Sequence, residues 1–359
     1  MINVTKTYLP DIEKYKSYVD QIYASGWITN NGELVQALEK RLKVYLGIKN
    51  IILVSNGTLA LQVAYKVLDL AGEVITTPFS FVATTSSLVW EGLKPVFADI
   101  DKDTLNIDAC KIERAITPHT SCIVPVHVFG NACNIEKISE IAERHSIKVI
   151  YDAAHAFGIT YKNESILNFG DISILSFHAT KIFHTIEGGA LVINDDALYE
   201  KAKRMINFGI ISGGNVAELG INAKMNEFEA AMGLCILDDM DKIIDRRKKV
   251  YEYYVRHLAQ LDGLRFQKQT QHCHMNFSYF PVIFKEEEKV MEVMGILQKH
   301  GIMPRRYFYP SLDKLPYIQN APDVPISNTV AKRILCLPIY DSLDIKKQVK
   351  IIEVVKEHI

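Results

Sequence analysis

The residues best suited to chemistry lie in one short segment near the middle of the chain. Residues 176–181 read Ser-Phe-His-Ala-Thr-Lys, and an earlier apolar run, residues 149–151, ends at Asp152. Lys181 therefore stands 29 residues after Asp152. An acid after one strand and a lysine after the next are typical of a pyridoxal phosphate site. There the carboxylate keeps the pyridine nitrogen protonated, and the amine attaches the cofactor and later moves a proton. The spacing predicts an enzyme of amine chemistry.

Each of these two residues has an ordinary interpretation when taken alone. Asp152 could cap a helix or lie on the surface, and a lysine is by default solvated. Their spacing favours the site, because ligands of open α/β sheets bind at the carboxyl ends of the strands. In such a place an acid makes a charge-assisted hydrogen bond, and a dry pocket lowers the pKa of a lysine such as Lys181.

Further polar and aromatic residues suit the same cofactor. Gly57 and Thr58 follow a predicted strand in the sequence Ser-Asn-Gly-Thr, so they and the free backbone amides of a helix start can bind phosphate; an ordinary N-cap is the alternative. Ser176 is a second candidate phosphate donor. His178 could contact the phosphate or the ring, or be structural. Phe81 is a candidate to stack on the pyridine face, although most phenylalanines are core residues.

Other motifs are weaker evidence for a binding site. Residues 187–190 (Glu-Gly-Gly-Ala) either let the backbone pass close to a ligand or form a plain turn. His272, Cys273 and His274 resemble metal ligands, but no second pair lies at structural-zinc spacing, so we expect a loop there and no metal. The absence of a G-x-G-x-x-G or Walker A motif argues against a nicotinamide or ATP site.

The composition narrows the class of protein. The 359 residues contain 48% apolar side chains, and 41 basic residues face 42 acidic ones, so we expect a globular chain that does not bind nucleic acid. The six cysteines form no C-x-x-C pair, which favours a reducing, cytoplasmic location. We expect no signal peptide and no membrane span, because no long apolar run is present.

Short apolar runs alternate with helical patterns through the first two thirds of the chain. This alternation predicts an α/β fold with a mostly parallel sheet covered by helices on both faces. The predicted strands are residues 51–55, 73–77, 95–99, 122–126, 148–151, 172–177 and 190–193, and the predicted helices include 58–70, 83–90 and 135–145.

The last third has a different pattern. Residues 227–255 predict one long helix that leads into a smaller domain, with a strand at 274–284 and helices at 287–300 and 344–357. We therefore expect a large domain over residues 1–240 and a small C-terminal α/β domain over 241–359.

With these residues in place, the chain resembles the DegT/DnrJ/EryC/StrS family of nucleotide-sugar aminotransferases over most of its length. The resemblance implies the aspartate aminotransferase-like fold (fold type I of pyridoxal phosphate enzymes), an active site shared across a homodimer, and a pyridoxal phosphate cofactor. The matching motifs are residues 26–32, 55–61, 123–130, 152–155, 176–181, 187–189 and 222–227.

The resemblance also implies roles for matching positions. Lys181 would carry the cofactor and shuttle the proton, and Asp152 would pair with the pyridine nitrogen. His155 stands where many members have a glutamine that contacts the phenolic oxygen of the cofactor. Phe81 matches the stacking aromatic residue. The phosphate would be bound by Gly57, Thr58 and Ser176, with Asn222 reaching across from the partner subunit.

The substrate expectation rests on finer likenesses. Residues 177–181 and 305–310 look like members that form dTDP-4-amino-4,6-dideoxyglucose from a dTDP-linked keto sugar and L-glutamate. His184 stands where asparagine is usual, close enough to Lys181 to touch sugar or phosphate, and Lys224 replaces a frequent arginine. The candidate substrate-binding residues are Thr29, His184, Arg305 and Tyr309.

Three alternatives stay open. One is a C-3 aminotransferase that acts on a dTDP-3-keto-6-deoxyhexose. Another is a pyridoxal phosphate-dependent sugar dehydratase, although such relatives carry histidine in place of Lys181. The third is a non-catalytic scaffold or regulator, which would not need Asp152, Ser176 and Lys181 together. We expect the downstream product to be a bacterial surface polysaccharide such as the O-antigen of lipopolysaccharide.

Overall fold

A seven-stranded sheet forms the centre of the computed structural model, which describes all of residues 1–359. The sheet is parallel except for β10, which is antiparallel to both of its neighbours. In spatial order its strands are β2 (Ile51–Val54), β10 (Gly189–Ile193), β9 (Ile172–Ser176), β6 (Lys148–Asp152), β5 (Thr120–Val124), β3 (Glu73–Thr76) and β4 (Lys94–Phe97).

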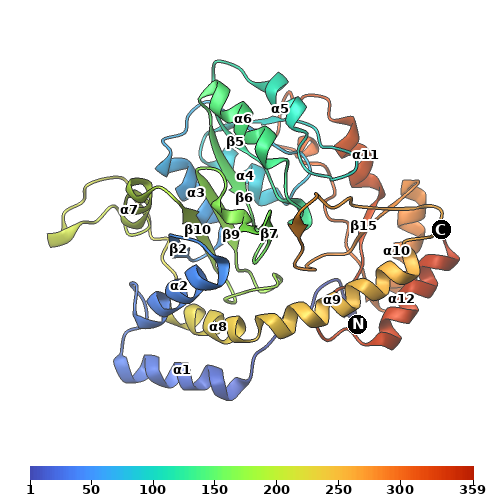
Figure 1. Cartoon of the computed structure of the whole chain (residues 1–359), viewed down its shortest axis with the longest axis horizontal. Helices are drawn as coiled ribbons and strands as arrows, with labels where there is room; N and C mark the ends of the chain where they lie inside the picture. The colour runs from blue at the N-terminus through green and yellow to red at the C-terminus, as the bar shows by residue number, and fades with distance from the viewer.

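Both faces of this sheet are buried. Side chains alternate between the two faces along each strand, so each strand contributes to a core on either side. In β2, Ile51 and Leu53 join one hydrophobic core, whereas Ile52 and Val54 join another on the opposite face. Helices cover both sides (Figure 1). The first core includes α2 (Glu33–Leu46), α5 (Ala109–Ala115), α6 (Ile135–His145) and α8 (Glu227–Asp238), and the second includes α3 (Gly57–Val67), α4 (Val82–Trp90) and α7 (Asp196–Met205). The predicted fold class is confirmed.

The C-terminal part builds a core of its own around a three-stranded antiparallel sheet, β11 (Leu264–Phe266), β13 (Pro281–Phe284) and β15 (Ile334–Cys336). Its helices are α9 (Met240–Leu258), α10 (Glu287–Lys299), α11 (Pro325–Arg333) and α12 (Ile345–Glu357). The first strand of the chain, β1 (Ile2–Asn3), pairs in parallel with β14 (Ile302–Met303) of this part. The domain boundary at residue 240 stays a prediction.

The prediction of one helix over residues 227–255 is wrong, because α8 and α9 are separated at Asp239. The adjacent carboxylates of Asp238 and Asp239 have different partners. The Tyr8 hydroxyl donates to the Asp239 carboxylate at 2.9 Å, while Asp238 forms ion pairs with Lys14 and Arg41. α1 (Ile12–Ser25) packs along α8 near this point.

The predicted strand over residues 274–284 is also wrong. Its start belongs to β12 (Cys273–His274), which pairs with β7 (Thr160–Tyr161), and its end forms β13 in another sheet; β8 (Glu164–Ser165) completes the sheet of β7 and β12. The chain between them bends at Phe277, whose φ of 56° lies in the left-handed region. This bend carries the chain past the strand ends of the central sheet.

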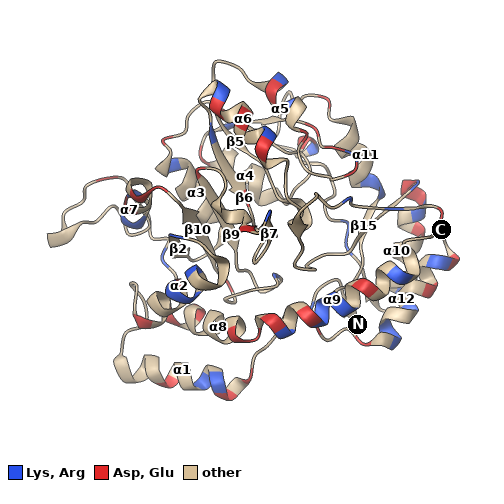
Figure 2. Cartoon of the chain, viewed as in Figure 1, with Lys and Arg blue, Asp and Glu red and all other residues tan.

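Charged side chains lie mainly on the outer helices, and α9 carries both signs along its length (Figure 2). The strands of the central sheet are nearly free of charge in the same view. No helix combines the length and apolar character needed to cross a membrane.

Candidate active site

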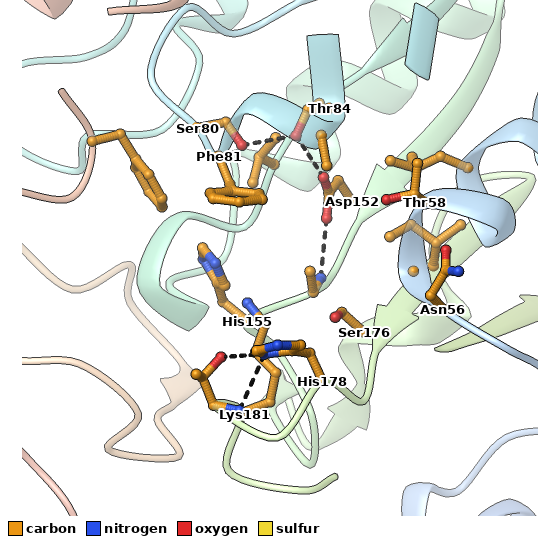
Figure 3. A pocket seen from close by; sticks show the side chains of 18 of the residues that line it. Asn56, Thr58, Ser80, Phe81, Thr84, Asp152, His155, Ser176, His178 and Lys181 are labelled. Atoms are coloured by element: carbon orange, nitrogen blue, oxygen red, sulfur yellow. Dashed lines mark hydrogen bonds between the residues drawn. The ribbon is translucent and has the colours of Figure 1, made fainter. Parts of the chain in front are cut away.

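A cavity of about 330 Å³ opens where β6 and β9 end and where α3 and α4 begin. Nine residues singled out in the sequence line it, although they come from separate segments. They are Gly57, Thr58, Phe81, Asp152, His155, Ser176, His178, Lys181 and Arg305. Figure 3 shows how most of these side chains face the same space.

One end of the cavity is suited to a phosphate. Asn56 caps α3 by accepting a hydrogen bond from the amide of Leu59 at 2.8 Å. Gly57 and Thr58 occupy the first two helical positions, whose amides have no acceptor within the helix. The hydroxyl of Ser176 lies against this turn. Free amides and hydroxyl groups at a helix start are donors for an anion.

Two glycines allow close packing at this end of the cavity. A Cβ atom on Gly57 would lie 2.9 Å from the Ser176 Cβ, and one on Gly189 would lie 2.6 Å from the backbone carbon of Asn56. The phosphate-binding turn therefore packs directly on β9 and β10, and a larger residue at either glycine would push it away.

The other end of the cavity is anchored by Asp152. Its carboxylate accepts a hydrogen bond from the Thr84 hydroxyl at 2.7 Å and from the Ala154 amide at 3.1 Å. Ser80 in turn donates to Thr84 at 2.9 Å (Figure 3). Burial raises the pKa of Asp152, and these donors oppose the rise. The carboxylate is fixed in direction and stays ready to hold a positively charged partner.

Lys181 lies between these ends, after the turn that follows β9. Its amine donates to the Tyr279 hydroxyl at 3.4 Å. Burial lowers the pKa of Lys181 to about 8, with the negative charge of Asp152 opposing this shift. A lysine with this pKa is partly neutral near physiological pH, as a nucleophile requires.

His155 and Phe81 form the sides of the cavity. His155 Nδ1 accepts a hydrogen bond from the Phe129 amide at 3.2 Å, so its proton resides on Nε2. Burial lowers the pKa of His155 well below 6.5, which keeps the ring neutral. Phe308 stacks on this ring at 5.7 Å. Phe81, at the N-cap of α4, is half exposed and faces the cavity (Figure 3).

His178 lies at the mouth of the cavity. Its Nδ1 is 2.7 Å from the Thr180 hydroxyl and accepts from the Thr180 amide at 3.2 Å. Its Nε2 lies 3.7 Å from the Glu187 carboxylate. The His178 ring therefore stabilises the turn that precedes Lys181, and it also lines the cavity.

Three of the candidate residues, Thr29, Asn222 and Tyr309, lie outside this cavity and are exposed or half exposed. Thr29 and Asn222 are exposed, and the Lys224 amine donates to the Asn222 side chain at 2.8 Å. Tyr309 is half exposed and stacks on the Arg306 guanidinium at 3.6 Å. Their roles in binding stay predictions.

His184 lies outside this cavity, and its expected contact with substrate or phosphate stays a prediction. The ring is buried, with 1% of its surface exposed. Its Nε2 lies 2.8 Å from the Tyr8 carbonyl, and its Nδ1 accepts from the Ile186 amide at 3.2 Å. Both nitrogens are therefore used within the protein, and His184 ties the N-terminal segment to the turn after Lys181.

Several lining residues are absent from the sequence prediction. Thr84 lies one helical turn after Phe81, so the expected stacking residue could have indicated it. Tyr279 comes from a segment that no local pattern marks, whereas Tyr307 and Phe308 belong to the 305–310 motif but have no predicted role of their own. Only the folded chain brings them to the cavity.

These features fit pyridoxal phosphate. The cavity has an anion-binding turn at one end, an oriented carboxylate at the other, an exposed aromatic face and an amine with a lowered pKa. Each would meet a different part of that molecule: the phosphate, the ring nitrogen, the ring face and the aldehyde.

The comparisons with known proteins agree with this geometry. The sequence profile of the DegT/DnrJ/EryC1/StrS aminotransferase family matches residues 11–356. The dTDP-4-amino-4,6-dideoxy-D-glucose transaminase of Shigella dysenteriae is 43% identical over 347 residues, covering 95% of each chain. Its namesake in Escherichia coli is 39% identical over 358 residues, covering 98% of this chain and 96% of the relative.

A solved structure supports the same assignment. DesI, crystallised in the presence of its TDP-sugar product, superposes with a TM-score of 0.95 at 33% identity, covering 99% of this chain and 92% of DesI. These matches confirm the expected fold, the aminotransferase class and the pyridoxal phosphate cofactor. The chain belongs to the DegT/DnrJ/EryC1/StrS aminotransferase family.

Proposed function

We propose that the enzyme transfers an amino group from L-glutamate to dTDP-4-keto-6-deoxy-D-glucose and thereby forms the 4-amino-4,6-dideoxy sugar. The observation that carries this proposal is the 43% identity, over 95% of both chains, to a transaminase named for that product. Amination at C-3 of a dTDP-3-keto-6-deoxyhexose is the competing substrate choice.

The residues of the cavity divide the work in this proposal. Pyridoxal phosphate supplies an electron-accepting ring that stabilises negative charge at the carbon next to the amine. Gly57, Thr58 and Ser176 would hold its phosphate, and Asp152 would keep its ring nitrogen protonated. His155 would donate from Nε2 to its phenolic oxygen. Phe81 would cover one face of the ring.

Lys181 performs the proton transfer in this proposal. Its amine loses a proton readily because burial lowers its pKa to about 8. The neutral amine can take a proton from the glutamate carbon that bears the amino group and give it to the cofactor. In the half-reaction with the keto sugar, Lys181 would move a proton from the cofactor to the sugar carbon. One residue therefore serves as base and acid in both half-reactions.

We also propose a homodimer with shared active sites. Asn222 is exposed on its own chain, and it follows a projecting loop between α7 and α8 (Figure 1). This loop exposes several large apolar side chains, which are Phe208, Ile210, Ile211, Val216, Leu219 and Ile221. Exposed apolar clusters of this kind are typical of protein interfaces. We propose the cytoplasm as the location, where six unpaired cysteines stay reduced.

The test uses the purified enzyme. The protein should be yellow from covalently bound cofactor, and glutamate should bleach that colour. Each keto-sugar isomer is then added to the glutamate-treated enzyme, and NMR identifies the product. An amine at C-4 supports the proposal, whereas an amine only at C-3 overturns the substrate choice. A colourless protein that binds no cofactor would favour a scaffold.

A further inference from the structure

Tyr279 shares the cavity wall with Lys181. Its phenol oxygen accepts the hydrogen bond from the Lys181 amine, and no protein group accepts the phenol's own proton. The Tyr279 ring packs 4.8 Å from His155, 5.2 Å from Phe129 and 5.9 Å from Tyr307, measured between ring centroids. The hydroxyl is therefore fixed in position and has an unused donor.

The segment before Tyr279 is attached to the wall that carries His155. The Asn276 side-chain amide donates to the carbonyls of His155 and Phe157, both at 3.0 Å. Its oxygen accepts from the Ser278 amide at 3.1 Å. Asn276 is 2% exposed, so these bonds are protected from water.

A buried arginine holds the same segment from the other side. Arg247 of α9 donates to the Phe277 carbonyl at 3.1 Å and to the Ser278 carbonyl at 2.9 Å. Arg247 forms no ion pair within 4 Å; burial lowers its pKa to about 10, and the more distant negative charge of Asp341 opposes this shift. Burying a cation without a paired anion is costly. The molecule uses this cation to fix two carbonyls next to Tyr279.

The backbone that the Asn276 and Arg247 side chains hold in place is strained. Phe277 has a φ of 56°, which a bulky side chain rarely adopts. Such strain persists only where the surroundings determine the conformation, and it concentrates at functional sites. Here the conformation turns Tyr279 toward Lys181.

We propose that Tyr279 is a positioning residue that holds the Lys181 amine at the cavity wall whenever this amine is not bonded to the cofactor. The inference rests on the proposed role of Lys181. When protonated, the amine donates to the phenol oxygen. When neutral, the amine nitrogen accepts the phenol proton. In both states Lys181 stays within reach of the atoms between which it moves a proton.

The test compares wild type with Tyr279→Phe, which keeps the ring and removes the hydroxyl. Glutamate-treated holoenzyme, in which Lys181 is free, is labelled with acetic anhydride across a pH series, and Lys181 acetylation is measured by mass spectrometry. The phenol oxygen favours the ammonium form, so its loss should lower the labelling midpoint by about half to one pH unit. Bleaching by glutamate should slow about tenfold, with half-saturation changed less than threefold.

Two further variants separate positioning from packing. Tyr279→Leu also lacks the hydroxyl, so its labelling midpoint should shift downward by the same amount. This variant provides the measurement if Tyr279→Phe folds poorly. Tyr254→Phe removes another buried hydroxyl, which donates to the Pro338 carbonyl at 2.9 Å far from Lys181. This control should lose thermal stability and keep the wild-type midpoint.

The outcomes are distinct. Wild-type enzyme that glutamate does not bleach refutes the proposed function. Wild-type bleaching, combined with an unchanged midpoint and rate in both Tyr279 variants, overturns the positioning role. A fall in melting temperature alone would show that Tyr279 only packs, and it would also overturn the inference.

Discussion

The two walls of the cavity are held in place by different forces. The wall of strand ends belongs to the central sheet, where backbone bonds such as Ala153 N to Ile174 O at 2.9 Å continue beyond the strands. The opposite wall includes the crossing segments 276–279 and 305–308, which lie outside regular strands. The first of these segments is fixed by its own Asn276, which donates to the His155 carbonyl, and by Arg247 of α9, which donates to the Ser278 carbonyl.

This difference suggests a division of labour. The strand-end wall carries Asp152, Ser176 and the phosphate turn, which must suit a cofactor of constant shape. The crossing wall carries Tyr279, Arg305 and Tyr307, which line the opposite side of the cavity and are the residues we expect the sugar substrate to meet. We expect changes in the first wall to lower the catalytic rate most, and changes in the second to have smaller effects on rate, substrate binding or stability.

The largest effect should come from Lys181→Ala, which removes the only amine in the cavity. Loss of both the nucleophile and the acid–base group should lower the turnover number by about 10⁴-fold or more. The variant should keep its melting temperature within a few degrees, because burial of the lysine opposes folding below pH 8. Turnover near the wild-type value would refute the assignment of Lys181.

Asp152→Asn should have the next largest effect. The amide preserves the shape and the Thr84 contact but removes the negative charge. Loss of a hydrogen bond between charged groups, about 2 to 3 kcal/mol, should lower the rate of the glutamate half-reaction about 30- to 100-fold. Stopped-flow bleaching measures this rate. A change smaller than threefold would contradict the pairing with the ring nitrogen.

Arg247→Met tests the crossing wall. It leaves the carbonyls of Phe277 and Ser278 unpaired, which should cost about 2 to 4 kcal/mol of stability. Differential scanning fluorimetry should show a clear drop in melting temperature, together with slower bleaching. Arg256→Met, at an exposed position of the same helix, is the control and should change neither measurement.

His184→Asn should change catalysis least. The ring is buried and both of its nitrogens have partners outside the cavity. We expect the KM for the keto sugar to change less than threefold, with a modest loss of stability from the Tyr8 contact. A tenfold rise in KM would support a substrate-binding role for this residue.

The sequence indicates the strand-end wall because that wall follows linear motifs. Asp152 and Ser176 come directly after apolar runs, and Gly57 follows another after Ser55 and Asn56; parallel strands bring such positions to one edge of a sheet. Their assembly around one cavity could therefore be predicted. The break at Asp239 could not, because it depends on Tyr8, Lys14 and Arg41, which are distant in the chain.

Apart from Arg305, which the sequence marks as a candidate, the crossing wall could not be predicted for the same physical reason. Tyr279 occupies a run of aromatic residues that looks like any buried strand, and its place depends on clamps from Asn276 and Arg247. His184 is three residues from Lys181, and closeness in sequence suggested a shared site. The turn between them sends its ring toward Tyr8 instead.

The pairing of β1 with β14 affects how the chain can be completed on the ribosome. Ile2 is made before its partner Ile302, which lies 300 residues later in the chain. Until then the leading end has no strand to join, while the central sheet already has all of its own. The pairing of β1 with β14 can therefore form only late in synthesis, after the nearby Tyr8 carbonyl can already contact His184.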